Sequence, residues 1–265
     1  MDLGLDGNAA LVTASSSGLG KASARALAAE GANVVLNGRD GDRLSEAVED
    51  VRADAAADAT VLGHAADITD PDAVEELVER PVEEFGRLDH LVTSAGGPPA
   101  KPFLETSDEE WYEAFDLLVM SVVRTVRAAA PHLAADGGGT VVTIASVSVK
   151  EAVDDLVLSN AVRAGVIGLE KTLSKELAPE IRANAVLPGT HETPRVETLI
   201  EKGVESGKYD SYEAGLDEWG GDIPAGRIGE PMDLGRVVAF LSSPQSSYVS
   251  GTALPIDGGE SSSNL

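Results

Sequence analysis

Apolar runs alternate with amphipathic stretches along the chain. The runs are short and rich in Val, Ala and Leu, which is typical of buried strands in a parallel sheet. The stretches between them repeat apolar residues at helical spacing and carry charge on the opposite face. We predict seven strands, near residues 8–13, 33–37, 60–64, 88–93, 139–145, 182–187 and 252–256. We predict helices near residues 18–30, 41–55, 71–85, 108–133, 156–178 and 231–242.

This alternation predicts an α/β fold, a Rossmann-like doubly wound parallel sheet with helices on both faces. No repeat, low-complexity region or linker interrupts it, so we expect one domain over residues 1–265. Residues 190–224 break the pattern with scattered Gly, Tyr, Trp and charged residues. A loop or short-helix insertion of that length is usually functional, and we expect a substrate loop that covers a site.

The charge composition of the chain excludes some classes of binding partner. The chain holds 45 acidic and 20 basic residues, a formal net charge of −25, and such a surface repels nucleic acid and anionic membranes. This balance resembles that of salt-in halophiles, where a Debye length of about 3 Å near 1 M salt screens the self-repulsion. An ordinary acidic mesophilic enzyme is the alternative.

The chain has no Cys, which excludes disulfides, thiolate nucleophiles and Cys-ligated metals, and we expect no metal centre. It opens with no basic flank before an apolar run, and no apolar segment approaches the roughly 18 residues that span a bilayer. We expect a cytoplasmic protein.

The first strand-to-helix turn carries a glycine pattern that suits a phosphate. Backbone N–H groups in such a turn approach a pyrophosphate, whose charge is favoured at a helix N-terminus. Close packing of helix on strand would require the same glycines without any ligand, and both interpretations stay open. The candidate cofactor residues here are Thr13, Ser15, Ser17, Gly18, Leu19 and Gly20.

This turn and later motifs, in order, resemble the short-chain dehydrogenase/reductase family, whose turn is Thr-Gly-x-x-x-Gly-x-Gly. Ala14 replaces the first Gly, and because its Cβ makes a positive φ costly, we expect a displaced turn or loosely held phosphates. The segments Ser94-Ala95-Gly96, 183–189 and 249–259 also match, so the resemblance covers nearly the whole chain. It implies a homotetramer or homodimer that pairs the helices near 108–133 and 156–178.

The resemblance also implies a nicotinamide dinucleotide. Gly38 stands where NAD-preferring members place an Asp, and Arg39 stands where NADP-preferring members place a cation, which suits a 2′-phosphate. NADP(H) is therefore favoured over NAD(H), with a plain surface arginine as the alternative. Asp67 stands where the family places an Asp that bonds the adenine amino group. The alternative is a helix cap, but Thr69 or Asp70 before Pro71 is the better cap, which leaves Asp67 free for a ligand. The other implied cofactor residues are Ser94, Ala95, Gly96, Arg163, Pro188, Gly189 and Thr193.

The family's catalytic Asn, Ser, Tyr and Lys match at only one position, Ser146. Leu118, Ser159 and Arg163 stand at the Asn, Tyr and Lys positions. Ser159 and Arg163 lie one helical turn apart and share a face. However, a Ser hydroxyl is a much weaker acid than a phenol, whose pKa is about 10, and Arg does not deprotonate. Loss of a positioned general acid costs about 10²–10⁴ in rate.

Arg163 can still bind ribose hydroxyls and polarise a substrate oxygen, with Ser146 and Ser159 as hydroxyl donors and water as the proton source. Among possible replacement acids, His191 is the best placed, because imidazole exchanges protons near neutrality. An exposed loop histidine is the alternative. A subgroup of β-ketoacyl-carrier-protein reductases resembles this chain in having Leu-Ser-Asn with an Arg four residues after the Ser.

Three functions remain open. The first is NADPH-dependent reduction of a small or acyl-carrier-linked carbonyl through a non-standard site. The second is a catalytically silent dinucleotide-binding protein that acts as a sensor or partner subunit. The third, cofactor-independent dehydration or epimerisation, needs a general base that the sequence does not place. We favour the first, because Arg39, Asp67, Gly189 and Thr193 occur together in the positions that a cofactor requires.

Overall fold

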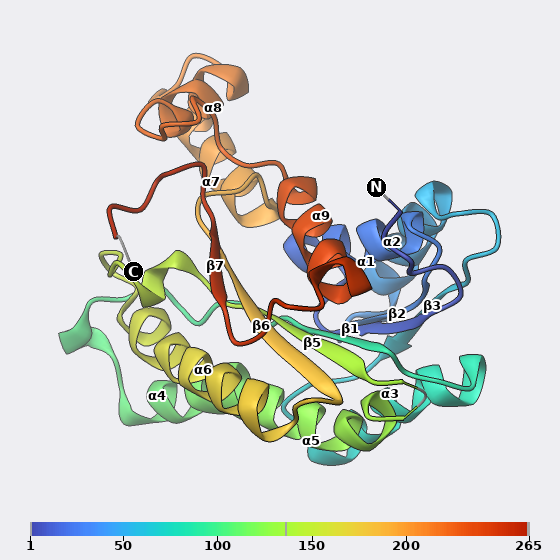
Figure 1. Cartoon of the computed structure of the whole chain (residues 1–265). Helices are drawn as coiled ribbons and strands as arrows, with labels where there is room; N and C mark the ends of the chain where they lie inside the picture. Colours follow the sequence, from blue (N-terminus) through green and yellow to red (C-terminus); the bar gives the residue numbers. More distant parts are fainter. Residues whose placement is uncertain (1, 136, 264–265) are drawn as a thin grey trace.

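A single parallel sheet lies at the centre of the molecule, between two layers of helices (Figure 1). The computed structural model describes residues 2–135 and 137–263. The strands run in the order β3-β2-β1-β4-β5-β6-β7, which confirms the predicted doubly wound sheet of seven strands. They are β1 (Ala9–Val12), β2 (Asn33–Gly38), β3 (Val61–Ala65), β4 (His90–Thr93), β5 (Gly139–Ile144), β6 (Ile181–Pro188) and β7 (Ala253–Ile256).

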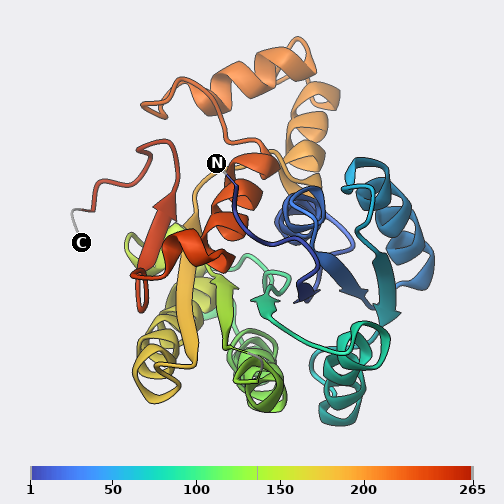
Figure 2. The ribbon, with the colours of Figure 1, turned by 45° about the vertical axis from the view of Figure 1, so that its right-hand side comes forward.

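The helices cover both faces of the sheet, as Figure 2 shows. On one face lie α1 (Gly18–Ala29), α2 (Gly41–Asp54) and α9 (Pro231–Ser242). On the other face lie α3 (Pro71–Phe85), α4 (Asp108–Phe115), α5 (Ser121–Leu133) and α6 (Val157–Glu176). No helix among residues 2–135 and 137–263 is both long enough and apolar enough to cross a bilayer.

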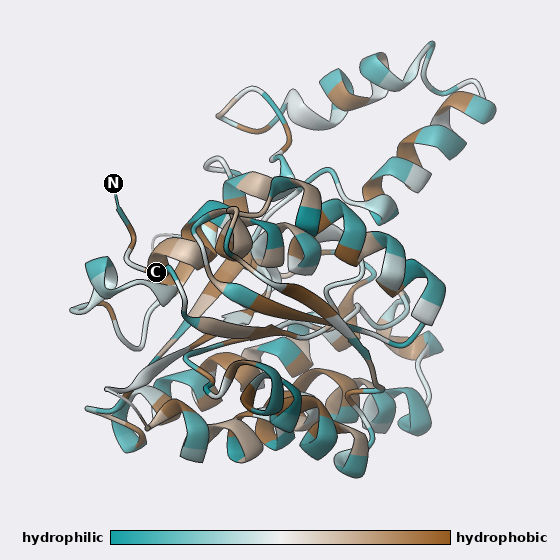
Figure 3. Ribbon diagram, turned by 90° about the vertical axis from the view of Figure 1, so that its right-hand side faces the viewer, coloured by the Kyte–Doolittle hydropathy of each residue, from teal (hydrophilic) through white to brown (hydrophobic). Residues whose placement is uncertain are grey.

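Each face of the sheet buries its own apolar cluster. Successive strand residues point to opposite faces, so Leu11 joins the cluster under α3 and α5 while Val12 joins the cluster under α1 and α9. The same division separates Val35 from Leu36. This two-sided burial explains why the strands are continuous apolar runs, which Figure 3 shows as brown strands beneath helices with teal outer faces.

The helix predicted over residues 108–133 is interrupted. A π-helical turn, Asp116–Met120, separates α4 from α5. Arg124 bridges this turn through a 2.6 Å ion pair with Asp116. The sequence conceals the interruption because Ala114, Leu118 and Val122 keep a spacing of four and all three are buried.

The 190–224 insertion contains two short helices, α7 (Pro194–Glu205) and α8 (Tyr212–Gly220), which stand above the end of β6 (Figure 1). They pack around Tyr209, whose ring leaves room for only a glycine at Gly203. Trp219 Nε1 donates to the Tyr209 hydroxyl at 3.0 Å. The insertion is therefore a packed helical unit.

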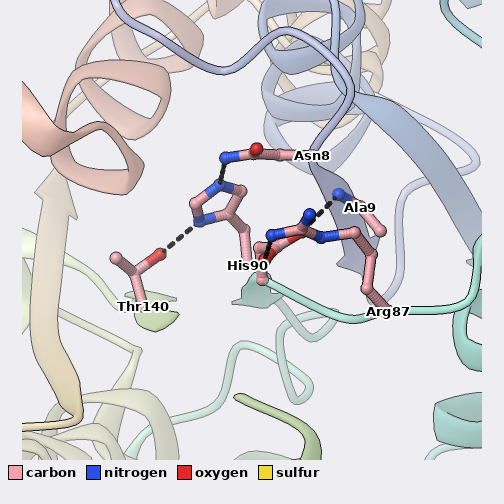
Figure 4. Close-up of polar contacts among 6 residues, drawn as sticks. Asn8, Ala9, Arg87, His90 and Thr140 are labelled. Atoms are coloured by element: carbon pink, nitrogen blue, oxygen red, sulfur yellow. Dashed lines mark hydrogen bonds and ion pairs between the residues drawn. The ribbon is translucent and has the colours of Figure 1, made fainter. Parts of the chain in front are cut away.

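The amino end of the sheet is fixed by a buried polar network (Figure 4). Asn8 Nδ2 lies 2.9 Å from His90 Nε2, and His90 Nδ1 lies 2.9 Å from Thr140 Oγ1. Because the amide donates to Nε2, the neutral ring carries its proton on Nδ1. Burial lowers the pKa of His90 to about 4, and the Arg182 and Arg87 charges act in the same direction while Asp89 opposes them. This histidine has a structural role.

Candidate active site

A cavity of about 530 Å³ opens at the carboxyl ends of β1, β2 and β4, where the strand order reverses. In doubly wound sheets this reversal is the usual ligand position. Most of the predicted cofactor residues line the cavity, namely Ser17, Leu19, Gly20, Arg39, Asp67, Ser94, Ala95, Gly96, Arg163, Pro188 and Thr193.

The turn between β1 and α1 is not displaced by the Ala at position 14. Ala14 takes the left-handed conformation that the glycine would take, with φ 45°. Its N–H donates to Asn37 Oδ1 at 3.1 Å, which fixes it to β2. Gly20 is required next to it, since a Cβ there would lie 2.6 Å from the Ala14 carbonyl oxygen. The turn therefore keeps a close approach of helix to strand at the cost of about 1 kcal/mol of backbone strain.

Thr13 and Ser15 do not line the cavity, which departs from their predicted cofactor role. Thr13 Oγ1 donates to the Ser94 carbonyl and accepts from the Ser94 N–H, both at 2.8 Å. The Ser15 hydroxyl donates to the Val12 carbonyl at 2.7 Å and accepts from the Asn37 N–H at 2.9 Å. Both side chains are buried, so they support the loop from beneath.

The N-terminus of α1 is open toward the cavity. Its N-cap residue, Ser17, makes no side-chain capping bond, and no acidic residue stands in the first turn. Gly18 does not line the cavity; it has φ 55° and packs against Thr193, the residue before α7. The free N–H groups and the positive end of the helix dipole fit a pyrophosphate.

The far end of the cavity is lined by two arginines and by two carboxylates, Asp40 and Asp67. Asp40 caps α2 by accepting from the Arg43 N–H at 3.0 Å. Arg39 is 77% exposed, and its Nη1 lies 3.7 Å from Asp67 Oδ2. Asp67 accepts from the N–H and the hydroxyl of Thr69 at 2.9 and 2.8 Å, and these bonds hold its pKa below the ordinary value. Asp70 caps α3, as expected. Arg43 also lines this end and was missed, although its spacing of four from Arg39 across a helix start was a usable signal.

Position 38 has no room for a side chain, because Ser16 lies against it. A Cβ at this position would lie 2.9 Å from both Cβ and Oγ of Ser16, a second lining residue that sequence reasoning missed. An Asp here would therefore push Ser16 out of place. The end of β2 therefore accommodates only a glycine, and Arg39 and Arg43 line the cavity beside it.

A second cavity of about 270 Å³ continues from the first, and Arg163 lines both. The structure brings the three predicted catalytic residues, Ser146, Ser159 and Arg163, together on its wall. Gly189 lines this cavity and not the first. Leu118 lies in the apolar core under α5 and reaches neither cavity.

Arg163 is a buried cation. Its Nε donates to Ser159 Oγ at 3.2 Å, as expected from their one-turn spacing. The remaining contacts, to the carbonyl oxygens of Ile144, Ala145 and Ala95, are all 3.5 Å long. Burial lowers the pKa of Arg163 to about 10, and no acidic residue in the described chain pairs with it. At neutral pH it remains charged.

His191 is buried, with 4% exposure, so the exposed-loop alternative is wrong. Its Nδ1 lies 3.0 Å from the Gly189 carbonyl oxygen and therefore carries the proton. Nε2 has no hydrogen-bond partner within the described residues and lies against Gly229, where a Cβ would be 2.8 Å away. His191 lines the second cavity, yet this nitrogen faces the backbone.

Fold and site together define a class, the doubly wound α/β proteins with a ligand cavity at the reversal of a parallel sheet. A family model described as enoyl-(acyl carrier protein) reductase matches residues 13–261. The 3-oxoacyl-(acyl-carrier-protein) reductase FabG of Thermotoga maritima is 34% identical over 256 residues, which cover 96% of this chain and 98% of that protein. The chain belongs to the short-chain dehydrogenase/reductase family of oxidoreductases.

Solved structures agree with this assignment. L-sorbose reductase from Gluconobacter frateurii, in complex with NADPH and L-sorbose, superposes with a TM-score of 0.93 at 32% identity and covers 99% of this chain and 100% of its own. An actinorhodin polyketide ketoreductase with NADPH superposes with a TM-score of 0.86 at 31% identity, covering 96% and 97%.

Proposed function

We propose that this protein is an NADP(H)-dependent reductase of carbonyl compounds that uses Ser146, Ser159 and Arg163 in place of a Tyr and Lys pair. The observation that carries the proposal is the position of Arg163, a buried cation on the wall shared by the two cavities. The complexes of L-sorbose reductase and the polyketide ketoreductase with NADPH support the choice of cofactor.

The cavity residues divide among the parts of the dinucleotide. The α1 N-terminus would hold the pyrophosphate, and Asp67 would accept from the adenine amino group. Arg39 and Arg43, beside Ser16 and Gly38, would hold the 2′-phosphate, because two guanidinium groups suit a dianion better than a ribose diol. Along the rest of the cavity, residues 94–96 would face the adenosine ribose, Arg163 the nicotinamide ribose and Thr193 the carboxamide.

The proposed reduction uses side chains that donate hydrogen bonds to the substrate and do not transfer a proton to it. The reduced nicotinamide supplies a hydride to the carbonyl carbon when bound. Arg163, Ser146 and Ser159 donate hydrogen bonds to the carbonyl oxygen and stabilise the charge that develops there. Water from the open side of the cavity then supplies the proton. Without a phenol, we expect a rate about 10²–10⁴ below that of a site with a positioned acid.

We also propose that the chain forms a homo-oligomer, and that it works in the cytoplasm at high salt. Four large apolar side chains stand exposed near α4, namely Phe103, Leu104, Tyr112 and Phe115. Exposed apolar groups of this size, close together in sequence, are typical of an interface. They adjoin the face on which α4, α5 and α6 are predicted to pair with a second subunit.

The first experiment is a fluorescence titration of the purified protein with NADPH and NADH in KCl, with Arg39→Ala, Arg163→Ala and Arg236→Ala as variants. Arg236 is 66% exposed on α9 and serves as the charge-matched control. We expect Arg39→Ala to weaken NADPH binding about tenfold and to spare NADH, since a charged hydrogen bond contributes about 1.5 kcal/mol.

Turnover distinguishes the reductase from a silent binding protein. A panel of carbonyl compounds, assayed by NADPH oxidation, should give activity that falls in Ser159→Ala and in Arg163→Ala. Saturable NADPH binding with no turnover on any carbonyl would favour the sensor or partner-subunit alternative. No binding of either nucleotide to the folded protein would refute the reductase.

A further inference from the structure

The second cavity has an unusual charge for this protein. Its ionisable lining residues are Arg163, His191 and Arg195, and no Asp or Glu of residues 2–135 and 137–263 lines it. The chain as a whole has 45 acidic and 20 basic residues. Glu192 follows His191 in sequence but does not line the cavity, and it accepts a hydrogen bond from the Tyr212 hydroxyl at 2.8 Å. A cavity with no acidic lining therefore lies inside an acidic molecule.

Arg163 alone leaves positive charge unbalanced in this cavity. Its guanidinium is buried without a carboxylate partner in the described chain, and its three carbonyl contacts are at 3.5 Å. A buried charge is usually paired, because desolvation without a partner is expensive. Its N–H fork has five donors, of which only Nε makes a contact shorter than 3.5 Å. The site can therefore serve a ribose and an anion together.

Arg195 adds a second guanidinium at the mouth. It lies in the first turn of α7, and a Cβ on Gly97 would be 3.2 Å from its Nη1, so its head reaches from the insertion to the segment after β4. Arg195 is exposed and has no ion-pair partner among the residues that the structure describes. Thr193, the N-cap residue of α7 beside it, makes no side-chain capping bond within the described part of the chain.

We infer that the substrate is a small oxo-acid. Its carboxylate is bound by Arg195, and Arg163 donates both to this carboxylate and to the carbonyl oxygen that faces Ser146 and Ser159. The inference rests on the proposed reductase function and specifies its substrate class. Two guanidinium groups with open donors match a carboxylate in charge and in bidentate geometry. The cavity of about 270 Å³ suits a compact molecule.

Trp219 provides a binding signal that does not depend on turnover, because it lines the same cavity. The chain has two Trp residues, so Trp111→Phe leaves Trp219 as the single tryptophan, which is excited selectively at about 295 nm. In this background the protein is titrated with 3-oxobutanoate and with 3-oxobutanamide, and with 2-oxobutanoate and 2-oxobutanamide. Each amide keeps the shape of its acid and lacks the charge. KCl is held constant, and each titration is run with and without NADPH.

We expect at least one acid to bind at least tenfold more tightly than its amide. Arg195→Gln should abolish most of this difference and leave amide binding unchanged, and Arg195→Lys should restore part of it. Arg236→Gln, an equal loss of charge on α9, should change neither. Equal binding of acid and amide, or equal effects of the Arg195 and Arg236 variants, would overturn the inference, as would no response to either acid.

The same samples separate this inference from the proposed function. Arg195→Gln should bind NADPH as the parent does, because Arg195 does not line the first cavity. Selective binding of an acid with no binding of NADPH would support the carboxylate site and refute the reductase. NADPH binding with turnover of neutral carbonyls alone would support the reductase and refute the carboxylate site.

Discussion

Glu170 offers the sharpest test of the packing beneath the site. This residue on α6 is 2% exposed and accepts a hydrogen bond from the Thr143 hydroxyl, which in turn lies 2.7 Å from the Thr93 hydroxyl. Its Oε2 has no hydrogen-bond partner in the described chain. Burial raises the pKa of Glu170 from 4.5 to about 8, and the Thr143 bond offsets this only partly. The native carboxyl is therefore neutral at pH 7.

The sign of the pH effect follows from this raised pKa. Between pH 4.5 and pH 8 the native state holds a proton that the unfolded chain releases. The stabilisation is complete below pH 4.5 and is lost as the pH rises to 8, at about 1.4 kcal/mol per pH unit. The loss approaches about 5 kcal/mol over the whole interval. Glu170→Gln has the same shape and no proton to lose.

Urea unfolding followed by circular dichroism, at constant KCl, measures this difference. Between pH 5.5 and pH 7.5 the Glu170→Gln variant should gain about 2.7 kcal/mol of unfolding free energy relative to the parent. Glu176→Gln, the same change at an exposed position of α6, should stay within about 0.5 kcal/mol of the parent throughout. A difference between Glu170→Gln and the parent that does not vary with pH would refute a neutral native carboxyl.

Three further outcomes follow from the contacts. Gly38→Asp should weaken NADPH binding at least tenfold in the fluorescence titration, because the new side chain collides with Ser16; unchanged affinity would contradict this account of the pocket. Gly20→Ala should cost about 2 kcal/mol in urea unfolding, whereas Gly41→Ala, with open space around its Cβ, should cost little. Since the pKa of His90 falls from 6.5 to about 4, its contribution is present above pH 6.5 and lost as pH falls toward 4. The His90→Gln variant should therefore lose less stability than the parent between pH 6.5 and pH 5, by about 2 kcal/mol in the same assay.

The fold could be predicted from the sequence because strands that are buried on both faces appear as short, continuous apolar runs. β1 is apolar at every position and β5 is buried at every position after Gly139, which is typical of a parallel sheet covered on both faces. The π-helical turn could not be predicted, since an extra residue in the helix left the apolar spacing intact. The sequence predicted a loop or short-helix insertion but not the bounds of α7 and α8, which pack around Tyr209 with Gly203 and Gly215 at the contact.

The candidate site was predicted where a residue's type and position determine its contact. Arg163 and Ser159 had to share a face because helical geometry fixes a spacing of four, and they are hydrogen-bonded. Thr13 and Ser15 were assigned to the cofactor because a loop sequence does not say which hydroxyls point inward. Arg43 and Arg195 lie in the first turns of α2 and α7, close in sequence to predicted site residues, but the sequence does not say which side chains of a first turn face the cavities.

The contrast between an acidic exterior and an arginine-lined interior governs how fast ligands can enter. NADPH and an oxo-acid are both anions, and a molecule of net charge −25 repels them at a distance before the buried arginines can attract them. Salt shortens the range of the outer repulsion, while the enclosed charges at Arg163 are screened less. Association of these proposed ligands should therefore accelerate as ionic strength rises, the reverse of the usual steering of charged ligands, so that ambient salt sets the speed of encounter.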